Sequence, residues 1–258
     1  MKYLIRFVAV LAVCFTMSVA EAQNKVVVVP MGGATGDAVP GDVLWGKTFS
    51  SKAGKGLTGT LELPLEPEVE VPVVTSEGQV WMALNLGASQ VATSSTDPAA
   101  YGTLYQWGRF GDGHEYRSSS TTSTQSSSDV PRHGSFILTS SDPYDWRTPQ
   151  HDNLWQGESG INNPCPAGFR LPTETEWERE RASWGSNNSA GAYASPLKLV
   201  LAGYRSNLNG ALNLAGIYGY YWSSTVVKSS SRYLYFESDA NMHYGARSCG
   251  FSVRCIKD

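Results

Sequence analysis

The chain has 258 residues, of which 41% are hydrophobic and 17% charged, a size and balance that exclude wholesale disorder and fit one large domain with a small appendage. The formal net charge is -3, which disfavours a general nucleic-acid binder, because such a protein needs a basic surface. The 26 glycines and 13 prolines indicate a turn-rich fold rather than a helical bundle.

The N-terminal segment has the pattern of a secretory signal peptide. Two basic residues precede an apolar run at 7–20, and a small-x-small cleavage site ends at Ala22. The run is shorter than the roughly 20 residues of a membrane-spanning helix, so a membrane anchor is the weaker interpretation. We expect residues 1–22 to be removed on export. The remaining protein is then secreted or held at the cell surface, and it does not span the membrane.

Residues 23–72 are expected to form a small β-rich stalk that ends in a Pro/Glu-rich linker. The β-branched run at 26–29 predicts a strand, and prolines spaced along the acidic stretch at 61–72 resist helix formation. Residues 41–48 match the phosphate-binding pattern G-x-x-x-x-G-K-T. However, Pro40 precedes the match directly and a poor helix-forming segment follows it, so we interpret it as a turn.

Residues 73–258 are expected to form the globular domain, because they contain seven of the eight tryptophans. The Ser/Thr-rich stretch at 118–128 predicts a surface loop that is a candidate for disorder. Thr173 and Glu176 form the pattern of a capping box, which predicts a helix that ends by Gly185. On that helix Trp177 and Trp184 share one face.

Short strands are predicted after the helix, at 220–225, 232–236 and 251–256, separated by Gly, Ser and Asn. The fold class is therefore α+β with little regular structure.

Cleavage of the signal peptide leaves three cysteines, Cys165, Cys249 and Cys255. Outside the cytoplasm a disulfide between two of them is expected, which leaves one thiol free or in an intermolecular link. Their spacing matches no standard zinc site.

Catalytic and metal-binding motifs are not evident in the sequence. Neither H-E-x-x-H nor G-x-S-x-G is present. Asp112 with His114, or His151 with Asp152, are alternatives for a site assembled by folding, but loop positions explain them more simply. We expect no cofactor. No Asp-x-Asp-x-Asp loop supports calcium, although calcium held by scattered loop oxygens remains an alternative.

Five segments, in order, resemble one known family. They read GQVWMALNLG (78–87), YGTLYQWG (101–108), NPCPAGFRLPT followed by Glu-Trp (163–173 and 176–177), GYYWSS (219–224) and GFSVRC (250–255). Together they are similar to the Fibrobacter succinogenes major paralogous domain (FISUMP), which resembles C-type-lectin-like and formylglycine-generating-enzyme-like folds. The resemblance covers about residues 74–258.

The resemblance implies a compact mixed fold with a twisted sheet and long irregular loops, preceded here by the β-rich stalk. It also implies a disulfide between Cys165 and Cys255. Cys249 would then be the remaining thiol, in a surface loop, at a position where this family more often has a small polar residue such as Asn.

Tyr, Ser, Gly and Asn make up about half of residues 203–250, a composition typical of antibody binding loops. In the strand at 232–236, alternation predicts that Leu234 and Phe236 are buried while Tyr233 and Tyr235 point outward. Asn241, His243 and Tyr244 lie in what we predict to be a Gly-flanked loop. The complete set of candidate ligand-binding residues is Tyr218, Tyr233, Tyr235, Asp239, Asn241, His243 and Tyr244.

C-type-lectin-like domains also serve as the variable proteins of diversity-generating retroelements. These elements mutate template adenines, so that Asn codons become codons for Tyr, Ser, Asp, His or Cys. Residues 218–249 are rich in those types. The alternative is ordinary drift in a surface loop.

The leading hypothesis is a secreted or surface-displayed binding protein, whose partner is a protein or a glycan on a cell or host surface. The hypothesis of calcium-dependent sugar binding of the usual lectin kind is disfavoured, because neither Glu-Pro-Asn nor Gln-Pro-Asp is present. A structural component of a surface layer or appendage is the alternative. An oxidase like the formylglycine-generating enzymes is disfavoured, because Cys249 and Cys255 form a copper pair only if Cys165 is unpaired.

Overall fold

The computed structural model describes residues 48–51, 54–58 and 71–258, and the chain divides into two units, Met1–Val69 and Glu70–Asp258. In the first unit, β1 (Thr48–Ser51) pairs with β2 (Gly54–Thr58) in an antiparallel hairpin. A phosphate-binding loop would need a helix to begin at Lys47, whereas a strand begins one residue later. The signal peptide, the strand expected at 26–29 and most of the proline-rich linker lie outside the described residues.

The second unit is a mixed fold with mostly short strands and few helices. Its helical elements are η2 (Pro98–Ala100), α2 (Glu174–Ala182) and α3 (Ser189–Ala194). Its strands are β3 (Val73–Ser76), β4 (Gln79–Met82), β5 (Tyr105–Gln106), β6 (Thr121–Thr122), β7 (Phe136–Ile137), β8 (Phe169–Arg170), β9 (Tyr204–Arg205), β10 (Leu212–Asn213), β11 (Gly219–Val227), β12 (Ser230–Phe236), β13 (Ala240–Gly245), β14 (Gly250–Phe251) and β15 (Ile256–Lys257).

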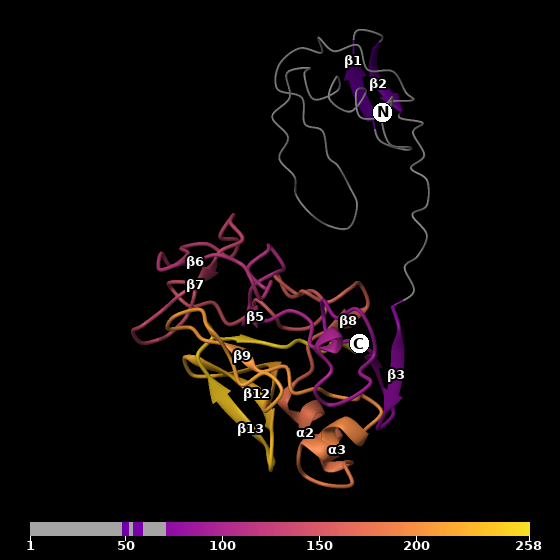
Figure 1. Cartoon of the computed structure of the whole chain (residues 1–258). Coiled ribbons are helices and arrows are strands. Elements are labelled where there is room, and N and C mark those ends of the chain that lie inside the picture. Colours follow the sequence, from indigo (N-terminus) through magenta and orange to yellow (C-terminus); the bar gives the residue numbers. More distant parts are fainter. Residues whose placement is uncertain (1–47, 52–53, 59–70) are drawn as a thin grey trace. The chain divides into compact units, whose positions relative to one another are not determined.

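Three sheets organise this unit. The first has the order β3-β4-β15-β8, the second β10-β9-β14-β5, and the third is the antiparallel meander β11-β12-β13. Strands β6 and β7 form a small parallel pair. Helix α2 packs against all three strands of the meander, and Figure 1 shows it beside β12 and β13. The last strands of the chain, β14 and β15, are therefore interior strands of two sheets.

Helix α2 begins where the sequence predicts it. The Thr173 hydroxyl accepts a hydrogen bond from the Glu176 N–H, and the Glu176 carboxylate accepts one from the Thr173 N–H, which completes the capping box. Trp177 is buried 5.0 Å from the Trp81 ring. The helix ends at Ala182, so Trp184 lies just beyond it, although Trp184 packs into the same hydrophobic cluster.

Three of the four tryptophans in the five sequence blocks, Trp107, Trp177 and Trp222, hold the core together through hydrogen bonds as well as by burial. The Trp107 Nε1–H donates to the Ser223 carbonyl at 2.9 Å, and the Trp222 Nε1–H donates back to the Tyr105 carbonyl at 2.8 Å. The Trp177 Nε1–H donates to the Trp222 carbonyl at 3.1 Å. Buried indole N–H groups need such partners, so each tryptophan fixes the path of a distant segment.

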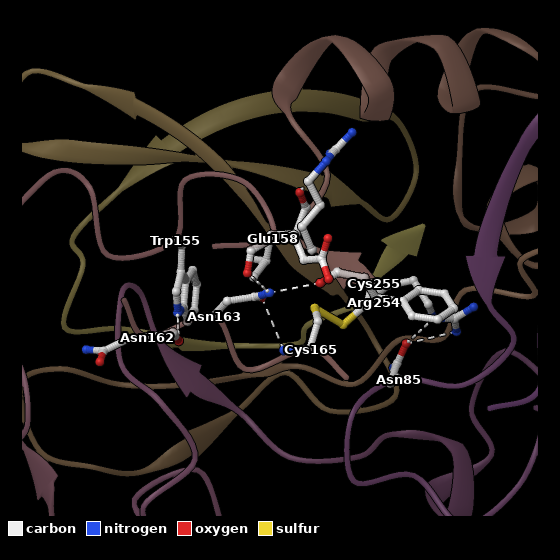
Figure 2. The surroundings of a disulfide bond; sticks show 11 residues. Asn85, Trp155, Glu158, Asn162, Asn163, Cys165, Arg254 and Cys255 are labelled. Carbon is white, nitrogen blue, oxygen red and sulfur yellow. Dashed lines mark hydrogen bonds between the residues drawn. A yellow bond between two sulfur atoms is a disulfide. The ribbon is translucent and has the colours of Figure 1, made fainter. Parts of the chain in front are cut away.

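A buried arginine links the first block to the last. The Arg254 guanidinium donates two hydrogen bonds to the Asn85 Oδ1, at 3.1 and 2.9 Å, and one each to the Met82 and Leu197 carbonyls. Burial lowers the pKa of Arg254 to about 10. Figure 2 shows Arg254 and Asn85 beside the disulfide between Cys165 and Cys255, which is present as the resemblance implied.

Three predictions of secondary structure need correction. Residues 240–245, predicted as a loop, form β13, because pairing with β12 satisfies their backbone although Asn and Gly disfavour strands. Residues 251–256 are split between β14 and β15, with the intervening residues outside any strand. The Ser/Thr stretch at 118–128 is largely exposed but contains β6, and the Ser126 N–H donates to the Trp146 carbonyl.

Candidate functional site

The two sides of the β11-β12-β13 meander differ sharply. One side is buried against α2 and carries Tyr221, Leu234 and Phe236, each with no exposed surface. Strand residues alternate between sides, so the neighbours Tyr220, Tyr233 and Tyr235 lie on the other side, partly exposed. The predicted alternation in β12, with Leu234 and Phe236 inward and the tyrosines outward, is confirmed.

A continuous aromatic surface covers this outer side, and we call it the tyrosine face. It consists of Tyr204, Tyr218, Tyr220, Tyr233, Tyr235 and His243. Neighbouring ring centroids lie 5.2 Å apart for Tyr204 and Tyr220, 5.5 Å for Tyr218 and Tyr235, and 5.3 Å for Tyr235 and His243. These spacings are those of interacting aromatic pairs, so the rings support one another.

The tyrosine face packs at one edge against buried aromatic residues on the same side of the meander. The Phe251 ring of β14 lies 4.3 Å from Trp222, 4.7 Å from Tyr233 and 5.1 Å from Tyr220. Trp222 and Phe251 are both buried. The side chains of the face are therefore held on regular strands over a filled core, which limits how far they move when a ligand binds.

An open hollow of about 320 Å³ lies in the tyrosine face. It is lined by Tyr220, Tyr233, Tyr235, Asp239 and His243. The Asp239 carboxylate sits in the turn between β12 and β13, where the Asn241 Nδ2–H donates to its Oδ2 at 2.6 Å. The hollow thus combines aromatic walls with one positioned carboxylate.

The structure brings together most of the residues that the sequence singled out. Tyr218, Tyr233, Tyr235, Asp239 and His243 belong to the tyrosine face or its hollow, and Asn241 lies opposite Tyr235 across the ladder. Tyr244 is 68% exposed but lies on the other side of the sheet. There it packs against Arg232, which is paired with Glu174 of α2.

Two residues of the face were missed by the sequence reasoning. Tyr220 was detectable, because Tyr220 and Tyr221 are neighbours in one strand and only one of the two can point into the core. Tyr204 was not detectable. It reaches the face because β9 pairs with β14, and the long-range pairing of two-residue strands leaves no periodicity in the sequence.

Loss of solvent shifts the pKa of phenols in the middle of the tyrosine face. It raises the pKa of Tyr220, and it raises the pKa of Tyr233 to about 12, with the nearby Cys249 and Tyr235 adding to the effect. Burial likewise raises the pKa of Tyr105, which lies in the core, to about 12. Near neutral pH each of these hydroxyls is therefore both a donor and an acceptor.

We expect the protein to lose stability as the pH rises from 10 to about 12. The unfolded tyrosines lose their protons near the ordinary value of 10.0, whereas Tyr105 and Tyr233 keep theirs in the folded state up to about 12. A raised pKa in the folded state stabilises folding below pH 10, and this contribution disappears across the interval. Denaturant unfolding at several pH values measures this loss of stability. In Tyr233→Phe, which has no phenol to ionise at this position, the free energy of unfolding should fall less steeply between pH 10 and about 12. If all native tyrosines ionise together near 10, the prediction is wrong.

Asp112, His114 and Glu115 form a cluster of potential metal ligands in the described part of the chain. Both His114 ring nitrogens are already used: Nδ1 lies 2.8 Å from Asp112 Oδ1, and Nε2 accepts a hydrogen bond from the Gln106 N–H at 3.1 Å. Burial lowers the pKa of His114 to about 4, so it is neutral and Nδ1 carries the proton. The cluster fixes a loop rather than offering a vacant ligand set.

The other candidate pair, His151 and Asp152, does not form a site. His151 Nδ1 lies 2.9 Å from Asp129, whereas Asp152 accepts a hydrogen bond from Arg247. The cysteines also leave no copper pair among the described residues, because Cys255 is bonded to Cys165. Cys249 remains a thiol that donates to Asn207 Oδ1 at 3.3 Å, and burial raises its pKa to about 11.

Comparisons with family models, with curated proteins and with solved structures found no match. Within the residues that the structure describes, every helix is too short or too polar to cross a lipid bilayer.

Proposed function

We propose that this chain is an exported binding protein, secreted or displayed at a cell surface, whose ligand contacts lie on the tyrosine face. One observation carries the proposal: five tyrosines and a histidine lie together on one side of a sheet whose other side is buried under α2. Tyrosine provides a large amphipathic contact area at low entropic cost, which suits a protein or glycan partner. A partly exposed, contiguous aromatic surface of this kind is typical of interaction sites.

We also propose that the unit Glu70–Asp258 has the C-type-lectin-like fold of the FISUMP family. Support comes from the way the five resembling blocks meet in the core. Trp107 and Trp222 exchange hydrogen bonds between the second and fourth blocks, and Arg254 joins the fifth block to the first. The blocks therefore have structural roles, and the tyrosine face is built mainly from residues between them.

A panel of glycans and surface proteins tests the binding proposal. The double variant Tyr218→Ala/Tyr235→Ala should bind the panel ligand at least about tenfold more weakly than the unchanged protein, because aromatic anchors dominate such interfaces. Tyr244→Ala is the matched control, since it removes an exposed tyrosine from the opposite side of the same sheet. Near-ultraviolet circular dichroism establishes that each variant is folded.

The outcomes of the panel separate the hypotheses. A ligand lost by the double variant and retained by Tyr244→Ala supports the proposal. No bound ligand, or one that depends on Tyr244 alone, contradicts it. Self-assembly of the purified protein without any external ligand would instead favour the structural-component alternative. The observation that favours this alternative is the exposure of three apolar side chains in the segment that precedes Tyr218: Leu208, Leu212 and Ile217.

Diversification by a retroelement is the part of the proposal that concerns residues 218–249. Adenine-directed mutation needs variable residues on a surface and constant residues beneath it. Tyr233, Tyr235 and His243 lie on the face, while Trp222 and Phe236 are fully buried. We expect deep sequencing of a population grown from one cell to show substitutions clustered in codons 204–250, with the Trp222 and Cys255 codons unchanged. Codons upstream of 204 are the internal control, and a uniform sequence would contradict diversification.

A further inference from the structure

The walls of the hollow are aromatic rings set at steep angles to one another. The Tyr220 and Tyr235 rings meet at 63°, Tyr235 and His243 at 75°, and Tyr220 and Tyr233 at 45°. With ring centroids 5.3 to 5.9 Å apart, these rings pack against one another and enclose no group between them. The hollow is therefore an open depression in a packed aromatic layer, lined by four aromatic side chains and one carboxylate.

Charge in the hollow has one sign. Asp239 lines it, and both Asp239 and Glu237 are close enough to Tyr235 to raise the pKa of that phenol. No Lys or Arg belongs to its lining in the part of the chain that the structure describes. Among nearby cations, Arg232 packs against Tyr244 on the far side of the sheet, and Arg205 lies over Phe136.

Asp239 is positioned rather than loose. Its Oδ2 accepts the hydrogen bond from Asn241, and the described residues give its Oδ1 no hydrogen bond. One carboxylate oxygen is therefore available at the edge of the aromatic walls. A cation that enters the hollow meets aromatic side chains, which attract cations, together with one carboxylate.

Resting on the proposed function, we infer that the hollow binds an organic cation: an ammonium or guanidinium group presented by the ligand. A basic side chain of a protein and a quaternary ammonium group share this chemistry. A sugar is the competing class, since it stacks on a flat ring and takes hydrogen bonds from several polar groups. The aromatic lining, the Asp239 carboxylate and the lack of Lys or Arg in the lining among the described residues favour the cation.

Two pairs of probes test the inference on the purified protein by nuclear magnetic resonance titration. Choline is compared with its neutral isostere 3,3-dimethylbutanol, and N-acetyl-lysine amide with N-acetyl-norleucine amide. Each cation should bind at least about tenfold more tightly than its neutral counterpart, since cation–π attraction and the carboxylate act only on the charged probe. Tighter binding of choline indicates a quaternary ammonium ligand, and tighter binding of the lysine amide indicates a basic side chain.

Variants identify the hollow as the binding site. Tyr235→Leu removes one aromatic ring from the lining and should abolish the preference for the cations. Asp239→Asn should weaken binding about threefold or more, because it removes one charge. Tyr244→Leu, on the opposite side of the sheet, should have no effect.

Several results would overturn the inference. These are equal binding of cations and isosteres, tighter binding of methyl glycosides than of cations, or an unchanged preference in Tyr235→Leu. If a panel ligand is lost by Tyr218→Ala/Tyr235→Ala while neither cation binds nor competes with it, the binding function stands and only the cation inference fails. If the face variants change nothing at all, both fail.

Discussion

Loss of the Cys165–Cys255 disulfide is expected to lower the free energy of unfolding by about 4–5 kcal/mol, the largest effect that we predict for a single bond in this protein. The bond spans 90 residues, and cross-linking so long a loop removes much of the entropy of the unfolded chain. It also ties the loop before β8 to the end of the chain, where Cys255 is fully buried.

Denaturant unfolding of Cys165→Ala/Cys255→Ala against the unchanged protein measures this effect. Cys249→Ser is the matched control, because it replaces the thiol that is not part of the disulfide. The new serine hydroxyl can still donate a hydrogen bond to Asn207. We expect the control to stay within about 1 kcal/mol of the unchanged protein. A loss of less than about 1 kcal/mol in the double variant would contradict the prediction and would mean that the unfolded chain is already compact.

Replacement of Arg254 by Met is expected to cost about 3 kcal/mol. It removes four hydrogen bonds and leaves the Asn85 Oδ1 and the Met82 and Leu197 carbonyls without their buried donor. Each unsatisfied acceptor costs about 1–3 kcal/mol, and recovery of the desolvation cost of the buried guanidinium offsets part of this. The lowering of the Arg254 pKa to about 10 shows that this desolvation is substantial.

Thermal and denaturant unfolding measure the effect, with Arg179→Met on the exposed surface of α2 as the control. The control should change stability by less than about 0.5 kcal/mol. Equal or greater stability of Arg254→Met would show that apolar packing replaces the buried charge at no cost. In that case Arg254 does not hold the first and last sequence blocks together.

How far the sequence predicts this fold depends on the range of the interactions involved. The capping box of α2 is local, so Thr173 and Glu176 predict the start of the helix correctly. Alternation within β12 is also local, and it places Tyr233 and Tyr235 correctly. The loop prediction around Asn241 and His243 was wrong, because these residues form a strand through pairing with β12 and not through their own preference for strands.

For the candidate site, too, local patterns predict the residues correctly and long-range pairing is missed. Six of the seven predicted residues gather on the outer side of the meander or at its rim, because a loop-like composition and strand alternation point to the same surface. Tyr244 is placed on the opposite side because β13 is a regular strand, so its side chain alternates with that of His243. Tyr204 joins the face through a sheet contact that no short-range pattern records.

The interior positions of β14 and β15 have a consequence for how fast this unit folds. Two sheets receive an inner strand from the last nine residues, since β14 lies between β9 and β5, and β15 lies between β4 and β8. Both strands pair with segments that lie far away in the sequence, so each sheet is completed by long-range contacts. Because such contacts form slowly, we expect this unit to fold more slowly than its short local elements alone would allow.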